Sequence, residues 1–165
     1  MRSNDILIDN TINFNNIQNL NEFKIIYFIY EYDDMLKAIA NKSIKEVSYH
    51  VRFSSDWIKR LGDGTEECHQ KIQTAINDLW IFTDELFHQT DADKEMVKQG
   101  IGIDVTLLKE DYNKKINSIL EEATLEIPQV EYFQKGGKLG IHSEHMGYLL
   151  SDLQYMQRTY PNMTW

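Results

Sequence analysis

The fold of this chain is decided by the stretch Lys42-Ser43-Ile44-Lys45-Glu46-Val47-Ser48-Tyr49-His50-Val51-Arg52-Phe53-Ser54. It lies within a longer run, Met35 to Leu61, in which small and apolar residues recur at spacings of three and four. This recurrence is the period of one face of an α-helix. We therefore predict one long helix here. Its buried stripe is predicted to consist of Leu36, Ala40, Ser43, Val47, His50, Ser54, Trp57 and Leu61.

A helix stop followed by a helix start comes next, in the sequence Gly62-Asp63-Gly64-Thr65. Gly62 suits the C-cap of the first helix, and Asp63 with Glu66 suits a capping box at the start of the second. The second helix is predicted to continue to about Phe87. So short a connection makes the two helices antiparallel neighbours. The residues predicted to face inward are Ile72, Ala75, Ile76, Leu79, Thr83 and Leu86.

The remainder of the chain also has a helical pattern. Residues 89–103 are predicted to be a polar connection with at most one helical turn, and Asp104 is predicted to cap a third helix that ends at about Glu122. Pro128 to Lys138 is predicted to be a loop, and a last helix is predicted from about Ser143 to a point before Pro161. No internal repeat and no strand-period pattern is present. The predicted fold class is all-α, an antiparallel ferritin-like helical bundle.

The N-terminal residues differ from the rest. Residues 1–21 contain seven asparagines and little periodicity, which predicts a poorly ordered arm. Phe23 to Tyr32 is dense in Ile, Phe and Tyr, and its helical neighbours favour a helix. We expect residues 1–34 to form a divergent arm with a partial helix, and residues 35–165 to form the helical domain.

Composition excludes several classes of function. The 165 residues suffice for one domain with a real core, and 42% of them are hydrophobic. A net charge of −9 argues against nucleic acid and against an anionic membrane surface as partners. The lone Cys68 excludes an internal disulfide and fits a reducing compartment. With no signal peptide and no apolar run of membrane-spanning length, we expect a cytoplasmic protein.

Three blocks of sequence together resemble one family. The first is the stretch quoted above, continued through Trp57 to Glu66; the second is Gln73-Thr74-Ala75-Ile76-Asn77-Asp78-Leu79-Trp80, continued to Phe87. The third is Gly136-Gly137-Lys138-Leu139-Gly140-Ile141-His142-Ser143-Glu144-His145-Met146-Gly147-Tyr148. In order and spacing they resemble the C subunit of the phenylacetyl-CoA ring epoxidase of phenylacetate catabolism, over about Met35 to Trp165.

The resemblance implies a role within a multicomponent monooxygenase. In such a complex the C subunit looks like a relative of the catalytic A subunit that has lost its metal site. The expected partner is therefore an A subunit that holds di-iron, with electrons from a separate reductase. This chain is expected to carry no catalytic residue and no cofactor. Family members have further helices before the first block, so we expect an incomplete bundle with an exposed hydrophobic stripe.

Two literal Glu-x-x-His pairs invite a di-iron interpretation. They are Glu66 with His69 and Glu85 with His88. Ferritin-like di-iron proteins carry one such pair on each of two helices. Both pairs here fall on the same predicted helix, where 19 residues correspond to roughly 28 Å. We interpret both pairs as solvated helix ends.

The other residues that could bind a metal do not form a complete set of ligands. Glu46 and His50 lie four residues apart on the first helix, and His142, Glu144 and His145 cluster at the start of the last. The alternative function is a self-sufficient ferritin-like di-metal oxidoreductase with Glu46, His50, Glu144 and His145 as ligands. The favoured interpretation is a satisfied core histidine at His50 and a packed helix start at His142 and His145.

Two further segments are candidate contacts. The loop Lys135-Gly136-Gly137-Lys138 precedes a helix and could bind an anion, either a phosphate of coenzyme A or a partner carboxylate, although a tight turn is favoured. The aromatic C-terminus, with Arg158, Tyr160 and Trp165, is a candidate partner interface. Cys68 is interpreted as a bystander thiol. A third possibility for the whole chain is a non-functional truncated relic.

Overall fold

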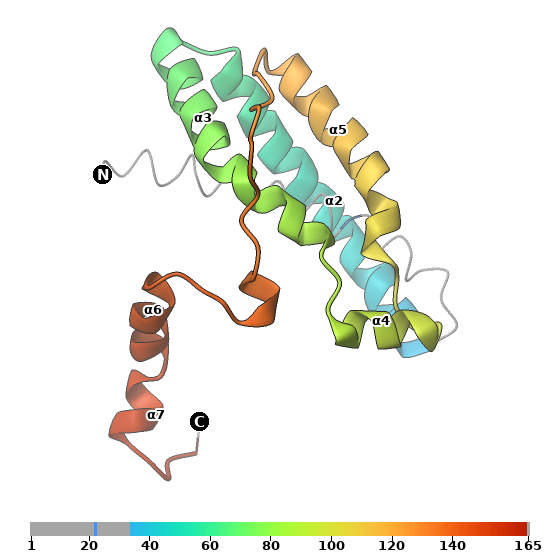
Figure 1. Ribbon diagram of the computed structural model, residues 1–165, viewed down its shortest axis with the longest axis vertical. Coiled ribbons are helices and arrows are strands. Elements are labelled where there is room, and N and C mark those ends of the chain that lie inside the picture. The colour runs from blue at the N-terminus through green and yellow to red at the C-terminus, as the bar shows by residue number, and fades with distance from the viewer. Residues whose placement is uncertain (1–21, 23–33, 165) are drawn as a thin grey trace. The chain divides into compact units, whose positions relative to one another are not determined.

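The computed structural model describes Glu22 and residues 34–164 (Figure 1). Within these residues every regular element is an α-helix or a 3₁₀ helix, so the predicted all-α, ferritin-like bundle is confirmed. The predicted arm, the helix at 23–32 and the terminal Trp165 lie outside the described residues. The elements are α2 (Asp34–Gly62), α3 (Glu66–Leu79), η1 (Trp80–Phe87), α4 (Asp91–Lys98), η2 (Val105–Leu108), α5 (Lys109–Glu122), η3 (Gly137–Leu139), α6 (His145–Leu153) and α7 (Tyr155–Thr159).

The chain divides into two compact units, Met1–Lys135 and Gly136–Trp165. In the first unit α2 packs against both α3 and α5. Figure 1 shows α2 and α5 running in the same direction and α3 in the opposite one, as the short α2–α3 connection predicts. The core is built from the inner faces of these helices: Ile58, Ile72, Ala75, Ile76, Phe87, Tyr112, Ile116, Ile119, Leu120, Ala123 and Leu125.

The α2–α3 connection is two residues longer than predicted, because α3 begins at Glu66. Asp63 continues the last turn of α2, because its amide donates to the carbonyl of Lys59 at 2.9 Å. The N-cap of α3 is Thr65, whose hydroxyl accepts from the amide of Cys68. The predicted N-cap at Asp63 is therefore wrong by two residues, because the Asp63 amide closes the turn after α2 and Thr65 caps α3.

The predicted second helix is α-helical only as far as Leu79. The following eight residues, Trp80–Phe87, form the 3₁₀ helix η1. The carbonyl of Ile81 accepts from the amide of Gln134 at 2.8 Å, so it is engaged from outside the helix. The stretch is also rich in aromatic and β-branched side chains, which have lower α-helix propensity. Of the residues predicted to face inward, Ile72, Ala75 and Ile76 are buried, and Leu79, Thr83 and Leu86 are half-buried.

The predicted polar connection contains a complete helix. Helix α4 begins with a capping box in which Thr90 and Asp93 bond reciprocally. Asp104 is confirmed as an N-cap, because its carboxylate accepts from the amide of Thr106 at 2.9 Å. The turn that it caps is the 3₁₀ helix η2, and α5 continues from it to Glu122, the predicted end.

The end of α5 uses an unusual residue. Thr124 adopts a left-handed conformation with φ of 57°, and the amide of Leu125 reaches back to the carbonyl of Leu120 at 2.9 Å. This is the Schellman arrangement, which glycine usually supplies because its φ is unrestricted. The Thr124 hydroxyl donates to the carbonyl of Gly62 at 3.4 Å and so ties this turn to the end of α2.

The second unit carries the predicted last helix in two pieces. Helix α6 ends at Leu153, and α7 ends at Thr159, before Pro161 as predicted. None of the helices within the described residues is long and apolar enough to cross a membrane.

Close packing at Gly62 generates the first prediction. A Cβ at this position would lie 2.2 Å from the carbonyl oxygen of Ala123, which is backbone and cannot move aside. We expect Gly62→Ala to lower the free energy of unfolding by about 1–3 kcal/mol through overpacking, measured by urea denaturation. Gly147→Ala is the control: no atom lies within 4 Å of its added Cβ, so the change should be neutral or slightly stabilising. Equal midpoints for the two variants would contradict the close approach.

Burial of Tyr112 generates a pH prediction. Its ring packs edge-on against Phe87 with centroids 5.1 Å apart, and desolvation raises the pKa of its phenol well above the ordinary value. The neutral form is favoured in the fold, so its stabilising contribution is complete below pH about 10 and is lost as the unfolded chain ionises above that pH. The loss should approach about 1.4 kcal/mol per pH unit.

Urea denaturation at pH 8, 10 and 11 should therefore show a steep alkaline decline in the wild type and a shallower one in Tyr112→Phe. Tyr49→Phe, at an exposed position on α2, is the matched control and should decline like the wild type. Identical slopes for all three proteins would show that Tyr112 does not control the alkaline loss.

Candidate functional site

The two Glu-x-x-His pairs occupy separate structural positions. His69 directs its Nδ1 to the carbonyl of Gly62 at 2.7 Å, and Glu66 accepts from the side-chain amide of Gln70 at 2.6 Å. The first pair thus supports the α2–α3 turn. Glu85 and His88 lie on and just after η1, beside a cavity. Within Glu22 and residues 34–164, no three side chains of His, Cys, Asp or Glu lie together as a possible metal cluster.

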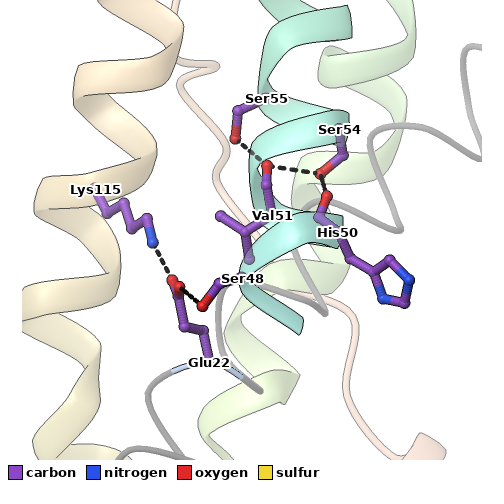
Figure 2. Close-up of polar contacts among 7 residues, drawn as sticks. All are labelled: Glu22, Ser48, His50, Val51, Ser54, Ser55 and Lys115. Carbon is purple, nitrogen blue, oxygen red and sulfur yellow. Dashed lines mark hydrogen bonds and ion pairs between the residues drawn. The ribbon is translucent and has the colours of Figure 1, made fainter. Parts of the chain in front are cut away.

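The ligand set of the di-metal alternative is divided between the two units. Glu46 and His50 lie on α2, with Oε1 and Nε2 4.0 Å apart, while Glu144 and His145 lie at the exposed start of α6. His50 is half-buried rather than a core residue, and Figure 2 shows its imidazole directed away from Glu22 and Lys115. The two pairs thus belong to different units, and the di-metal alternative stays a prediction.

The glycine-rich loop has the geometry of a tight turn. Gly136 and Gly140 have φ of 112° and 85°, values that favour glycine. The amides of Leu139 and Ile141 both donate to the carbonyl of Gly136 at 2.9 Å. These amides are consumed inside the turn, which leaves fewer of them for an anion. The anion, coenzyme A or partner contact predicted at Lys135, Gly136, Gly137 and Lys138 stays a prediction.

Lys135 lines a cavity of about 330 Å³ in the first unit. Its ammonium lies 3.9 Å from one carboxylate oxygen of Asp84, and the ammonium of Lys109 lies 2.5 Å from the other. Two cations thus share one carboxylate at the cavity wall, and the local balance of these three groups is positive. The other lining residues are Glu85, Phe87, His88 and Thr106.

A polar bridge that the sequence did not predict crosses the inner face of α2. The carboxylate of Glu22 accepts from the hydroxyl of Ser48 at 2.8 Å and forms an ion pair with Lys115 on α5 (Figure 2). The side chain of Glu22 is only 15% exposed. The partners are 93 positions apart, a separation across which a local pattern carries no signal.

Two buried serines lie on the same helix. The hydroxyls of Ser54 and Ser55 donate to backbone carbonyls one turn earlier, Ser54 to His50 at 2.8 Å and Ser55 to Val51 at 2.7 Å (Figure 2). Their polar groups are therefore satisfied within α2, so their burial carries no unpaired donor. Small side chains at these positions let the neighbouring helices approach closely.

A stripe of exposed aromatic residues runs along the outer face of α2. This outer stripe consists of Tyr49, Phe53 and Trp57, which are 53%, 49% and 41% exposed. The predicted inward position of Trp57 is thus wrong, because the inner face is centred on Val51, Ser54 and Ile58. The rings form a continuous row: Tyr49 stacks on Phe53 at 6.1 Å, and Phe53 meets Trp57 edge-on at 6.4 Å. An exposed hydrophobic stripe, as predicted, is present.

The second unit exposes further apolar side chains. Arg158 and Tyr160, predicted as partner contacts, are both exposed, while Trp165 lies outside the described residues. Leu139, Ile141, Tyr148, Leu149, Leu150, Leu153, Tyr155, Met156 and Met163 are exposed in the same unit. Exposed apolar surface of this extent is typical of interaction sites. The second unit thus exposes apolar side chains on and around both α6 and α7.

Comparison with known proteins agrees with the helical architecture. Residues 30–165 match the family described as phenylacetic acid catabolic protein. The chain belongs to this family. It is 44% identical over 133 residues to the C subunit of 1,2-phenylacetyl-CoA epoxidase from Escherichia coli strain K12. The match covers 81% of this chain and 54% of the relative, so the chain spans about half of the relative's length.

The polar bridge yields a stability prediction for this family member. Lys115→Met leaves the Glu22 carboxylate without its ammonium partner in a mostly enclosed position. We expect a loss of about 1–3 kcal/mol in the free energy of unfolding. Lys114→Met removes a lysine from a fully exposed pair with Glu110 on the same helix and should leave the free energy of unfolding close to that of the wild type.

Urea denaturation of both variants measures the difference. Adding Glu22→Gln to Lys115→Met removes the buried charge, and should recover part of the loss. Equal effects of the two lysine substitutions, with no recovery in the double variant, would contradict a stabilising bridge.

Proposed function

We propose that this chain is a non-catalytic structural subunit of a phenylacetyl-CoA epoxidase and supports a di-iron A subunit in aerobic phenylacetate degradation. The observation that carries the proposal is the 44% identity over 133 residues with the C subunit of that epoxidase. The name of this relative implies an assembly of several subunits. In this assembly the A subunit would hold the iron and perform ring epoxidation of phenylacetyl-CoA, in the cytoplasm.

The roles of the potential metal ligands support a structural rather than a catalytic part. His69 stabilises the end of α2 through the carbonyl of Gly62, and Glu66 pairs with Gln70 on α3. Glu22, the most enclosed carboxylate that the structure describes in an ion pair, faces an ammonium and a hydroxyl. His69 connects α3 to the end of α2, and Glu22 connects α2 to α5, which is the function expected of a supporting subunit.

The surface supports the partner proposal in a different way. Large apolar side chains remain exposed in the second unit, on α6 and α7 and in the segment before them. An A subunit that covers part of this surface would remove it from water, which stabilises the complex by about 25 cal/mol per Å² of apolar area before the costs of association.

Co-expression with the catalytic A subunit, followed by co-purification and iron analysis, tests the proposal. We expect both chains to elute together, with iron in proportion to the A subunit alone. The C subunit of the Escherichia coli epoxidase, expressed with the same A subunit, is the positive control for assembly.

Failure of this chain to co-elute where the control succeeds would overturn the supporting role. Iron bound to this chain without the A subunit would instead favour the di-metal alternative, and insolubility of the chain in both preparations would favour a relic.

A further inference from the structure

The outer stripe of α2 has an arrangement that the proposed supporting role does not explain. Helix α2 buries one face against α3 and α5, yet its opposite face carries Tyr49, Phe53 and Trp57 in a row. A surface helix normally has one apolar face and one polar face. Apolar side chains on opposite faces are typical of a helix covered on both sides. Within the described residues, nothing reduces the exposure of these three rings below 41%.

The residues around Phe53 are arranged symmetrically along the helix. Tyr49 and Trp57 lie four positions before and after it, and Glu46 and Arg60 lie seven positions before and after it. Seven residues are nearly two helical turns, with a drift of about 20°, so Glu46, Phe53 and Arg60 share one line on the helix surface. The order along this face is therefore acid, aromatic, aromatic, aromatic, base.

This order is complementary to its own reverse. If a second α2 lies antiparallel with its Phe53 against Phe53, each Glu46 faces Arg60 of the second copy, and each Tyr49 lies near Trp57 of the second copy. A two-fold axis requires this reciprocity, because each residue must contact the residue that contacts it. A parallel pairing would instead place Glu46 against Glu46 and Arg60 against Arg60, which repel each other.

The side chains are also preorganised for such a contact. The guanidinium of Arg60 lies 5.7 Å from the centre of the Trp57 ring, and that of Arg52 lies 5.7 Å from the centre of the Tyr49 ring. The two cations thus lie over the first and the last ring of the aromatic row. Glu46 remains exposed, with 74% of its side chain accessible. Aromatic and arginine side chains held in place lose little conformational freedom when an interface forms.

We propose that the outer stripe of α2 is the interface of a symmetric homodimer, in which Phe53 lies on the two-fold axis and Glu46 pairs with Arg60 of the second copy. The aromatic row supplies the apolar centre of this interface, and the two ion pairs at its ends set the antiparallel register. This contact is independent of the A subunit and goes beyond the proposed supporting role.

A charge exchange on the purified full chain tests the register by analytical ultracentrifugation. Glu46→Arg and Arg60→Glu, each alone, place like charges against each other at both ends of the interface. Each should weaken dimerisation at least about tenfold. The double variant Glu46→Arg with Arg60→Glu restores opposite charges and should return the dissociation constant to within about threefold of the wild type.

A second pair of variants tests the centre. Phe53→Asp brings two carboxylates together on the axis and should give a monomer, whereas Leu107→Asp, at an exposed position on η2, should leave the dimer intact. Circular dichroism and urea midpoints verify that each variant is folded.

A monomeric wild type at high micromolar concentration, or a double variant as weak as the single ones, would overturn the proposal. The stripe would then be covered by residues of the same chain or by the A subunit. The second case is recognised when Phe53→Asp abolishes co-elution with the A subunit while the wild type alone is a monomer. Failure of co-elution with an intact dimer would overturn the supporting role alone.

Discussion

The structure of the first unit depends on the close meeting of three helix ends at Gly62. The last residue of α2 approaches the backbone of Ala123 so closely that any side chain would collide with it. Its carbonyl accepts from the ring of His69 at the start of α3 and from the hydroxyl of Thr124 after α5. One backbone group thus joins α2, α3 and α5. The hydrophobic core, which includes Ile58, Ile72 and Ile116, lies between the same three helices.

The junction also explains the roles of residues that would otherwise resemble ligands. His69 belongs to a Glu-x-x-His pair, and its Nδ1 donates to the carbonyl of Gly62, a group at the end of α2 that has no partner within its own helix. The ion pair of Lys59 with Glu122, at 2.5 Å, lies at the same end of α2 and α5, and the hydrogen bond from Lys59 lowers the pKa of Glu122. Farther along the same two helices, Glu22, Ser48 and Lys115 form the second polar connection. Polar chemistry in this unit therefore serves to align helices.

The outer face of α2, unlike its inner face, makes no contact with α3 or α5. Burial of either apolar face of α2 is favourable, and the described bundle buries only the inner face. In the proposed dimer the aromatic row supplies the apolar contact. Glu46 and Arg60 at its ends select the antiparallel arrangement, because only that arrangement places opposite charges against each other. The proposed dimer contact would cover this outer face.

The helical periods, the turn at residues 62–65, the cap at Asp104 and the helix end before Pro161 could be predicted from the sequence, because each depends on neighbours within a few positions. It placed Trp57 inward, since a period of three and four does not distinguish the two faces of a helix that is apolar on both. It also extended an α-helix to Phe87, where the carbonyl of Ile81 is in fact engaged by Gln134. The exposed position of Trp57, the 3₁₀ helix at residues 80–87 and the Glu22–Lys115 pair depend on tertiary contacts. Their partners lie tens of residues away, and which of them meet depends on how whole helices pack.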